Sequence, residues 1–177
     1  MAEKMRKLLK KEYVFRGRKF SVRLDYYQIN SKIYTAEIVE HKGAVVILPL
    51  LQNKVILIEQ YRYPIQKYIL ELPAGTLEKG EKPEETAKRE LIEEIGYKAN
   101  RLEPLGKLYA SPGYTTEILY AYLALNPEKT LSHPEEYEDI KPVNINIDKI
   151  PALIKENKII DGKTLATFML YFSRRKN

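Results

Sequence analysis

The stretch GTLEKGEKPEETAKRELIEEIGY, residues 75–97, decides the fold of this chain. Its second half predicts a helix over Pro83–Ile95, because proline suits the first turn of a helix and Gly96 follows as a stop. Apolar residues recur at four-residue spacing and form a core-facing stripe of Ala87, Leu91 and Ile95. The stretch therefore reads as a loop, an amphipathic helix and a terminating glycine.

Three carboxylates crowd one side of this helix, those of Glu90, Glu93 and Glu94. Like charges at spacings of three and four residues repel by roughly 0.2–0.5 kcal/mol per pair. The cluster therefore predicts either a cation held among the oxygens or a plain solvated acidic face. The chain has no cysteine and only 2 histidines, so a bound cation is expected to be hard, Mg²⁺ or Mn²⁺.

Composition limits the remaining choices. A chain of 177 residues with 44% hydrophobic content can bury one sizeable core. We expect a soluble, cytoplasmic protein, because no apolar run reaches the length of a membrane span and no signal-peptide pattern opens the chain. The net charge of +6 is concentrated near the N-terminus. A solvated basic surface is the favoured reading of that charge over nucleic-acid binding.

The rest of the chain predicts a mixed β-sheet with helices on its faces, an α/β (α+β) fold. Two helices are expected near the C-terminus, over residues 148–156 with Asp148 as cap and over residues 161–176. Residues 12–17 are also rich in strand-forming side chains. The expected strands are Phe20–Ile29 with 33–41 as a hairpin, 43–51 with 54–63 as a buried pair, 68–75, 101–111, 117–125 and 140–147.

The complete spacing of residues 75–97 resembles the Nudix box, G-x5-E-x7-R-E-U-x-E-E-x-G-U, where U is an aliphatic residue. Every fixed letter is matched, and only Tyr97 stands where an aliphatic residue is usual. Seven specified positions coincide by chance on the order of 10⁻⁸ per starting point, given ordinary residue frequencies. The resemblance implies a Nudix fold, in which helices sandwich a mixed β-sheet. We expect residues 43–177 to form the hydrolase domain and residues 1–42 an N-terminal antiparallel strand extension.

The resemblance also implies roles for the box residues in cleaving a nucleoside diphosphate joined to another group. Two or three Mg²⁺ ions, or Mn²⁺, would be bound there. The implied metal ligands are Glu90, Glu93, Glu94 and the main-chain carbonyl of Ala74. Glu93 and Arg89 would be catalytic, and Glu81 would support Arg89. Gly75 and Gly96 would be structural.

The flanking segments are similar to one branch of that family, the ADP-ribose pyrophosphatases. The matching segments are VEHKGAVVILPL (39–50), VILIEQYRYP (55–64), LELPAG (70–75) and ASPGYTTE (110–117), whose Pro112 lies 15 residues after Tyr97. The similarity implies hydrolysis of ADP-ribose to AMP and ribose 5-phosphate. The alternatives are another nucleoside diphosphate derivative, such as a nucleotide sugar, NADH or a dinucleoside polyphosphate, and a nucleotide-sensing module without catalysis.

Matched to that branch, several further residues acquire expected roles. Arg62 would contact the diphosphate or the terminal ribose. Phe20 would stack on adenine, with Glu37 as a polar partner. The site would be organised by Pro112, Gly113 and Glu117. Taken alone, each could equally be a surface, turn or core residue. The general base is expected in the acidic segment at residues 134–140, with Glu136 favoured and Glu138 next. The branch also implies a homodimer, in which the N-terminal strands of one subunit complete the adenine site of the other.

Overall fold

The structure is a computed structural model that describes residues 6–131 and 139–174. The chain divides into two compact units. The first unit comprises residues 1–43 together with 109–118, and the second comprises residues 44–108 and 119–177. Within the described residues, no helix is both long enough and apolar enough to cross a membrane.

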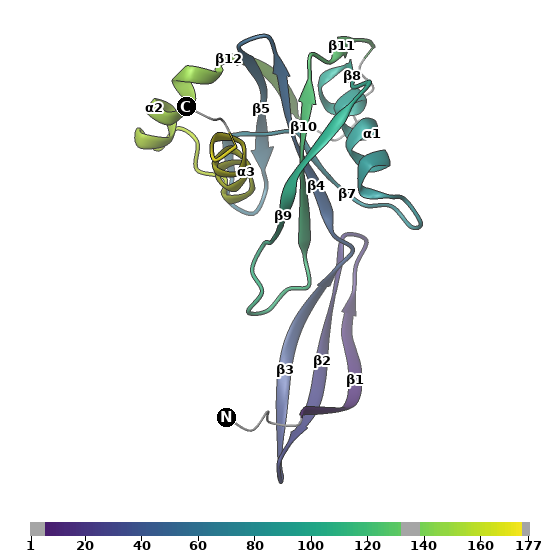
Figure 1. The fold of residues 1–177 in the computed structure, drawn as a ribbon. Helices are drawn as coiled ribbons and strands as arrows, with labels where there is room; N and C mark the ends of the chain where they lie inside the picture. The colour runs from purple at the N-terminus through teal and green to yellow at the C-terminus, as the bar shows by residue number, and fades with distance from the viewer. Residues whose placement is uncertain (1–5, 132–138, 175–177) are drawn as a thin grey trace. The chain divides into compact units, whose positions relative to one another are not determined.

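The first unit is built on a three-stranded antiparallel sheet (Figure 1). Its strands, in spatial order, are β1 (Arg6–Arg16), β2 (Phe20–Ile29) and β3 (Lys32–His41). The expected hairpin is confirmed, because Ile29 pairs with Lys32 and Phe20 pairs with His41. Asn30 takes a positive φ of 55° in the connecting turn, a conformation that asparagine tolerates better than most residues. The strand-like residues 12–17 are the end of the much longer β1.

A buried ionic cluster lies within this sheet. The Arg23 guanidinium donates to Asp25 at 2.8 Å and also to Glu40, and the Tyr13 hydroxyl donates to Glu40 at 2.8 Å. Arg23 and Asp25 are buried. Neighbouring strands thus share polar contacts through their side chains as well as through the backbone ladder.

The second unit holds a seven-stranded mixed sheet of order β12-β5-β4-β10-β9, with β6 beside β5 and β7 beside β4. β10 runs parallel to β4, and β12 runs antiparallel to β5. Two short strands, β8 (Tyr97–Lys98) and β11 (Glu128–Lys129), pair separately. The strands of the main sheet are β4 (Ala44–Leu51), β5 (Lys54–Arg62), β6 (Lys67–Glu71), β7 (Ala74–Thr76), β9 (Leu102–Tyr109), β10 (Ile118–Leu125) and β12 (Ile140–Asn146).

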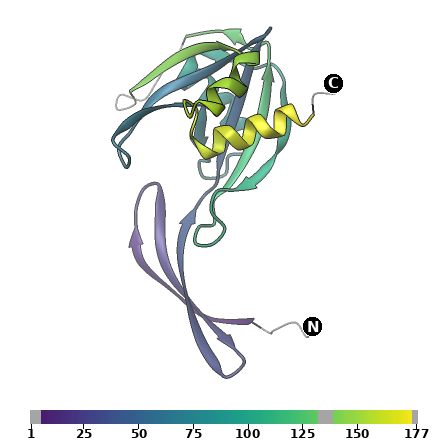
Figure 2. The same cartoon turned by 90° about the vertical axis from the view of Figure 1, so that its left-hand side faces the viewer.

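Helices cover both faces of this sheet. α1 (Pro83–Ile95) lies on one side, and α2 (Ile150–Lys155) and α3 (Gly162–Phe172) lie on the other (Figure 1). Figure 2 shows α3 crossing its face of the sheet. Alternate residues of the central strands enter the two cores, since Val46 and Leu48 pack with Phe168 while Val45 and Ile47 pack with Leu91. Burial on both faces explains why these strands read as continuous apolar runs.

The boundaries of α1 agree with the sequence prediction, and Gly96 ends the helix with a left-handed φ of 68°. Other boundaries were predicted wrongly. Asp148 is not a cap, because the Asn146 side chain accepts from the Asp148 N–H and starts the 3₁₀ turn η1 (Ile147–Lys149) ahead of α2. α3 ends at Phe172 rather than at residue 176.

The expected strand over residues 68–75 is two strands, because the chain changes neighbours at Leu72–Pro73. Proline has no N–H to donate to a ladder. Its carbonyl instead accepts from the N–H of Ile47 at 2.9 Å. The chain therefore leaves β5, crosses to β4, and delivers Ala74 and Gly75 to the N-terminal side of the loop that precedes α1.

Candidate active site

The carboxylates of Glu90 and Glu94 lie against the main chain of β7. The Ala74 N–H donates to Glu94 Oε2 at 3.0 Å. A Cβ at Gly75 would be only 1.8 Å from Glu90 Oε1, so only glycine allows this approach. Both glutamates are buried. The expected structural role of Gly75 thus has a direct cause, which is the position of the Glu90 side chain.

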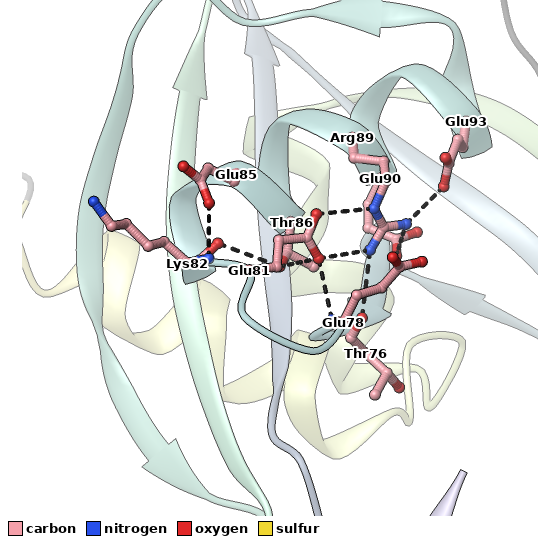
Figure 3. A network of polar contacts seen from close by, with 9 residues as sticks. All are labelled: Thr76, Glu78, Glu81, Lys82, Glu85, Thr86, Arg89, Glu90 and Glu93. Carbon is pink, nitrogen blue, oxygen red and sulfur yellow. Dashed lines mark hydrogen bonds and ion pairs between the residues drawn. The ribbon is translucent and has the colours of Figure 1, made fainter. Parts of the chain in front are cut away.

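Arg89 joins three carboxylates of the box (Figure 3). Its Nη1 donates to Glu90 Oε1 and to Glu93 Oε2, each at 2.8 Å. Its other edge faces Glu81, with Nε 3.1 Å from Oε1 and Nη2 3.2 Å from Oε2. Nη2 also donates to the Thr76 carbonyl at 3.4 Å. A single guanidinium therefore ties the helix to the loop that precedes it.

The loop between β7 and α1 is fixed by Glu81. Besides Arg89, Glu81 accepts from the Glu78 N–H at 3.1 Å and from the Thr86 hydroxyl at 2.8 Å (Figure 3). At the helix start, the Lys82 N–H donates to Glu85 at 2.9 Å. These contacts hold the loop in one conformation before the first helical turn.

The network shifts two pKa values. Hydrogen bonds from Arg89, opposed by burial and supported by bonds from Thr86 and the Glu78 N–H, lower the pKa of Glu81 to about 2. Burial lowers the pKa of Arg89, but its bonds to Glu81, Glu90 and Glu93 outweigh burial and raise that pKa well above its usual value. Both groups are therefore fully charged near neutral pH.

The chemistry of the oxygen donors around α1 suits a hard divalent cation. Glu90, Glu93 and Glu94 offer carboxylate oxygens beside the Ala74 peptide, and oxygen is the ligand that Mg²⁺ and Mn²⁺ prefer. As the side chains are placed, residues 6–131 and 139–174 hold no group of three carboxylate or imidazole residues arranged to bind a metal ion. The Arg89 guanidinium lies between Glu90 and Glu93 and supplies positive charge there.

Arg62 lies at the end of β5 and is held by a residue that the sequence analysis did not select. Its Nε and Nη2 donate to the two oxygens of Glu71, each at 2.6 Å. The hydrogen bonds that Arg62 donates to Glu71 raise the pKa of Arg62, and the charge of Glu94 adds to that shift. Glu71 is fully buried. A lone acid in the apolar run YILEL was the signal available in the sequence.

Other selected residues belong to the first unit. Phe20 is 44% exposed and lines a groove of about 390 Å³ together with Arg18, Lys19, His41 and Lys42. Glu37 is exposed and pairs with Leu24 farther along the hairpin. The structure thus places Phe20 at a concave surface and Glu37 at an exposed position of β3 outside that groove.

The turn that carries Pro112 and Gly113 is closed by the Tyr114 N–H, which donates to the Ser111 carbonyl at 3.2 Å. Glu117 lies 3.8 Å from His41 Nδ1. The two candidate bases, Glu136 and Glu138, lie outside the described residues.

Comparison with known proteins gives consistent matches. A family model for the NUDIX domain matches residues 40–168. The methanol dehydrogenase activator of Bacillus methanolicus is 39% identical over 163 residues, covering 90% of this chain and 88% of that protein. The ADP-ribose pyrophosphatase of Bacillus subtilis is 36% identical over 162 residues, covering 89% and 88%. A solved structure of an ADP compounds hydrolase superposes with a TM-score of 0.86 at 25% identity, covering 98% of this chain and 95% of that one.

The contact at Gly75 makes the first prediction. In Gly75→Ala, the new Cβ must displace the Glu90 carboxylate, since the two would otherwise be 1.8 Å apart. We expect Mn²⁺ affinity, measured by calorimetry, to fall about tenfold or more, as when the surroundings of a metal ligand are disturbed. Gly162→Ala is the matched control, because a Cβ there meets no atom within 4 Å and Gly162 has no proposed role in the site. Unchanged Mn²⁺ affinity in Gly75→Ala would show that Glu90 is not a ligand.

The low pKa of Glu81 makes the second prediction. The folded-state pKa of about 2 lies below the ordinary 4.5, so the ionised carboxylate stabilises the fold above pH 4.5. That contribution is lost as the pH falls from 4.5 towards 2. We expect the melting temperature of Glu81→Gln to be lower than that of the wild type at pH 6, with the difference shrinking by pH 2.5. Glu156→Gln, at an exposed position, is the control. A difference that stays constant with pH would contradict the assignment.

Proposed function

The chain belongs to the NUDIX domain family, and on that premise we propose that it hydrolyses the pyrophosphate bond of ADP-ribose to AMP and ribose 5-phosphate. The observation that carries the proposal is the complete acidic box, with Glu90 and Glu94 set against the main chain of residues 74–75. Support for the substrate comes from the ADP-ribose pyrophosphatases of Bacillus subtilis, at 36% identity, and Mycobacterium tuberculosis, at 35% over 78% of this chain.

In the proposed reaction, Glu90, Glu93, Glu94 and the Ala74 carbonyl would hold two or three Mg²⁺ ions, with Mn²⁺ as the alternative. When bound, such ions neutralise a diphosphate and lower the pKa of a coordinated water. Arg89 donates to Glu90 and Glu93 and so keeps their carboxylates in place. Arg62 presents a cation to the diphosphate or the terminal ribose, which suits a guanidinium that recognises phosphate. Glu136, with Glu138 next, is proposed as the base that accepts the proton.

For the nucleoside end of the substrate, we propose the groove beside Phe20. Its exposed ring can stack on a base, and Arg18, Lys19 and Lys42 make the surroundings cationic. Glu37 would accept from the exocyclic amine of adenine. Pro112, Gly113 and Glu117 would organise the segment next to it.

Two other functions have a specific observation behind them. GDP-mannose pyrophosphatases, such as that of Yersinia pestis, are 33% identical over 64% of this chain, so a nucleotide sugar is a second candidate substrate. The Bacillus methanolicus relative, at 39% identity, is named as an activator of methanol dehydrogenase, so activation of a dehydrogenase is a candidate further role. Comparing AMP release from ADP-ribose with GMP release from GDP-mannose separates the two candidate substrates, whereas activation of a dehydrogenase would be a role in addition to hydrolysis.

The third prediction tests catalysis directly. We expect AMP release from ADP-ribose with Mg²⁺, its loss on chelation with EDTA, and slower cleavage of GDP-mannose. Glu94→Gln should lower kcat by about 10²-fold or more, because it removes a charged oxygen beside the Ala74 peptide. Glu93→Gln should act in the same direction. Lys88→Gln, on the exposed side of α1, is the control and should leave kcat unchanged. Near-wild-type turnover in both glutamine variants would remove the metal-site assignment.

We also propose that the protein is a homodimer that uses the sheet of the first unit. Among its described residues, the first unit has no helix. Its sheet exposes apolar side chains, which include Leu8, Val14, Phe15, Ile33 and Tyr34. Apolar residues gathered on an uncovered sheet favour burial against another surface.

The fourth prediction tests this assembly. Sedimentation at micromolar concentration should give about twice the 20.7 kDa chain mass. Val14→Asp should shift the protein towards the monomer, because a charge would then enter the interface. Leu131→Asp, at an even more exposed apolar position in the second unit, should leave the mass unchanged. A wild-type monomer at this concentration would refute the dimer.

A further inference from the structure

A cluster of four charged residues joins the start of α3 to the end of β6. At its centre the fully buried Glu71 carboxylate accepts from Arg62 through two bonds of 2.6 Å and also from Lys163 Nζ. Lys163 Nζ lies 3.0 Å from Asp161 Oδ2 as well. Burial raises the pKa of Glu71, but the two cations outweigh burial and hold that pKa below its usual value.

A second contact links the same two elements. The Thr164 hydroxyl accepts from the Leu72 N–H at 2.9 Å and donates to Asp161 Oδ2 at 2.7 Å. Asp161 also caps α3, accepting from the Thr164 N–H at 2.9 Å. The N-terminal turn of α3 therefore fixes residues 71 and 72, which are separated from the Ala74–Gly75 peptide of the candidate site only by Pro73.

The charges of the cluster explain why two cations share one carboxylate. Arg62, Glu71 and Asp161 by themselves would carry a net charge of −1, and that excess would oppose the approach of an anionic ligand to the guanidinium. Lys163 supplies the balancing positive charge, so that the four charges sum to zero. The Arg62 side chain keeps 34% of its surface exposed, while Lys163 keeps 16%.

Stability alone does not account for such a cluster. Buried ion pairs repay their desolvation cost poorly, and apolar residues of similar volume often stabilise a fold better. The surrounding core offers such residues, since Leu70, Leu72 and Phe168 pack there. The cluster is therefore better explained by its effect on the electrostatic surroundings of the partly exposed Arg62 guanidinium.

We propose that Lys163 is a positioning residue, which balances the negative charges of Glu71 and Asp161 beside Arg62 and thereby leaves the positive charge of Arg62 available to a substrate diphosphate. The inference rests on the proposed function in one respect, that Arg62 contacts the substrate. Removing Lys163 leaves Arg62, Glu71 and Asp161 with a net charge of −1. Removing the charge of Asp161 as well restores a sum of zero.

The fifth prediction uses this charge balance. Lys163→Met should raise KM for ADP-ribose about thirtyfold, the effect of one unbalanced charge at an effective dielectric near 20 over roughly 8 Å, while kcat changes far less. Asp161→Asn in the same chain should return KM to within about threefold of the wild type, and Lys163→Arg should stay close to it. A purely structural role predicts no such recovery, because the double variant also loses the charged acceptor of the Thr164 bonds and should be no better than Lys163→Met alone.

The control is Lys158→Met, which removes an exposed lysine from the segment just before α3 and should leave KM unchanged. If the wild type does not cleave ADP-ribose, the proposed function fails by itself. The same variants are then compared by their dissociation constants for α,β-methylene-ADP, a diphosphate that is not hydrolysed at that bond. A Lys163→Met variant with unchanged KM and unchanged dissociation constant, or a double variant no better than the single one, would overturn the proposal.

Discussion

The close contact between Glu90 and the main chain of Gly75 is the constraint on which the rest of the site depends. No side chain fits at residue 75, so β7 and α1 approach each other through a carboxylate rather than through apolar packing. Glu94 strengthens the same contact by accepting from the Ala74 N–H. The apolar stripe of α1 lies beside these carboxylates, and its residues Ala87, Leu91 and Ile95 pack with Val45 and Ile47. The helix thus has a dry face that anchors it and an acidic face fixed to the main chain.

The electrostatic cost of that acidic face is only partly offset. Glu81, Glu90 and Glu93 carry three negative charges, and Arg89 supplies one positive charge, so two negative charges remain before Glu94 is counted. Such an excess is costly in a partly buried site, where charges are screened less than in water. Binding of divalent cations would remove it. The same residues therefore show both what holds the loop and the helix together and why the site would favour a cation.

The sequence predicts the parts of the structure that depend on local pattern. The proline, the apolar stripe and Gly96 define α1 correctly, and the apolar runs at 43–51 and 54–63 identify the doubly buried strands. The spacing of the box identifies the acidic face. It does not reveal Glu71 or Lys163, because the contact between them joins residues 92 positions apart. Nor does it show that Leu72–Pro73 divides one apolar segment between two neighbours, since that division depends on which strand lies alongside.

Residues 71–75 show how the two faces of the sheet meet at one site. Each of the five has a separate long-range contact: Glu71 with Lys163, Leu72 with Thr164, Pro73 with Ile47, Ala74 with Glu94 and Gly75 with Glu90. The first two contacts come from α3 on one face, and the last two come from α1 on the other. A segment in which every residue makes a long-range contact has little freedom to relax when ligands change the charge around it. The C-terminal helix, although distant in sequence from the box, is therefore as much a support of the acidic site as α1 itself.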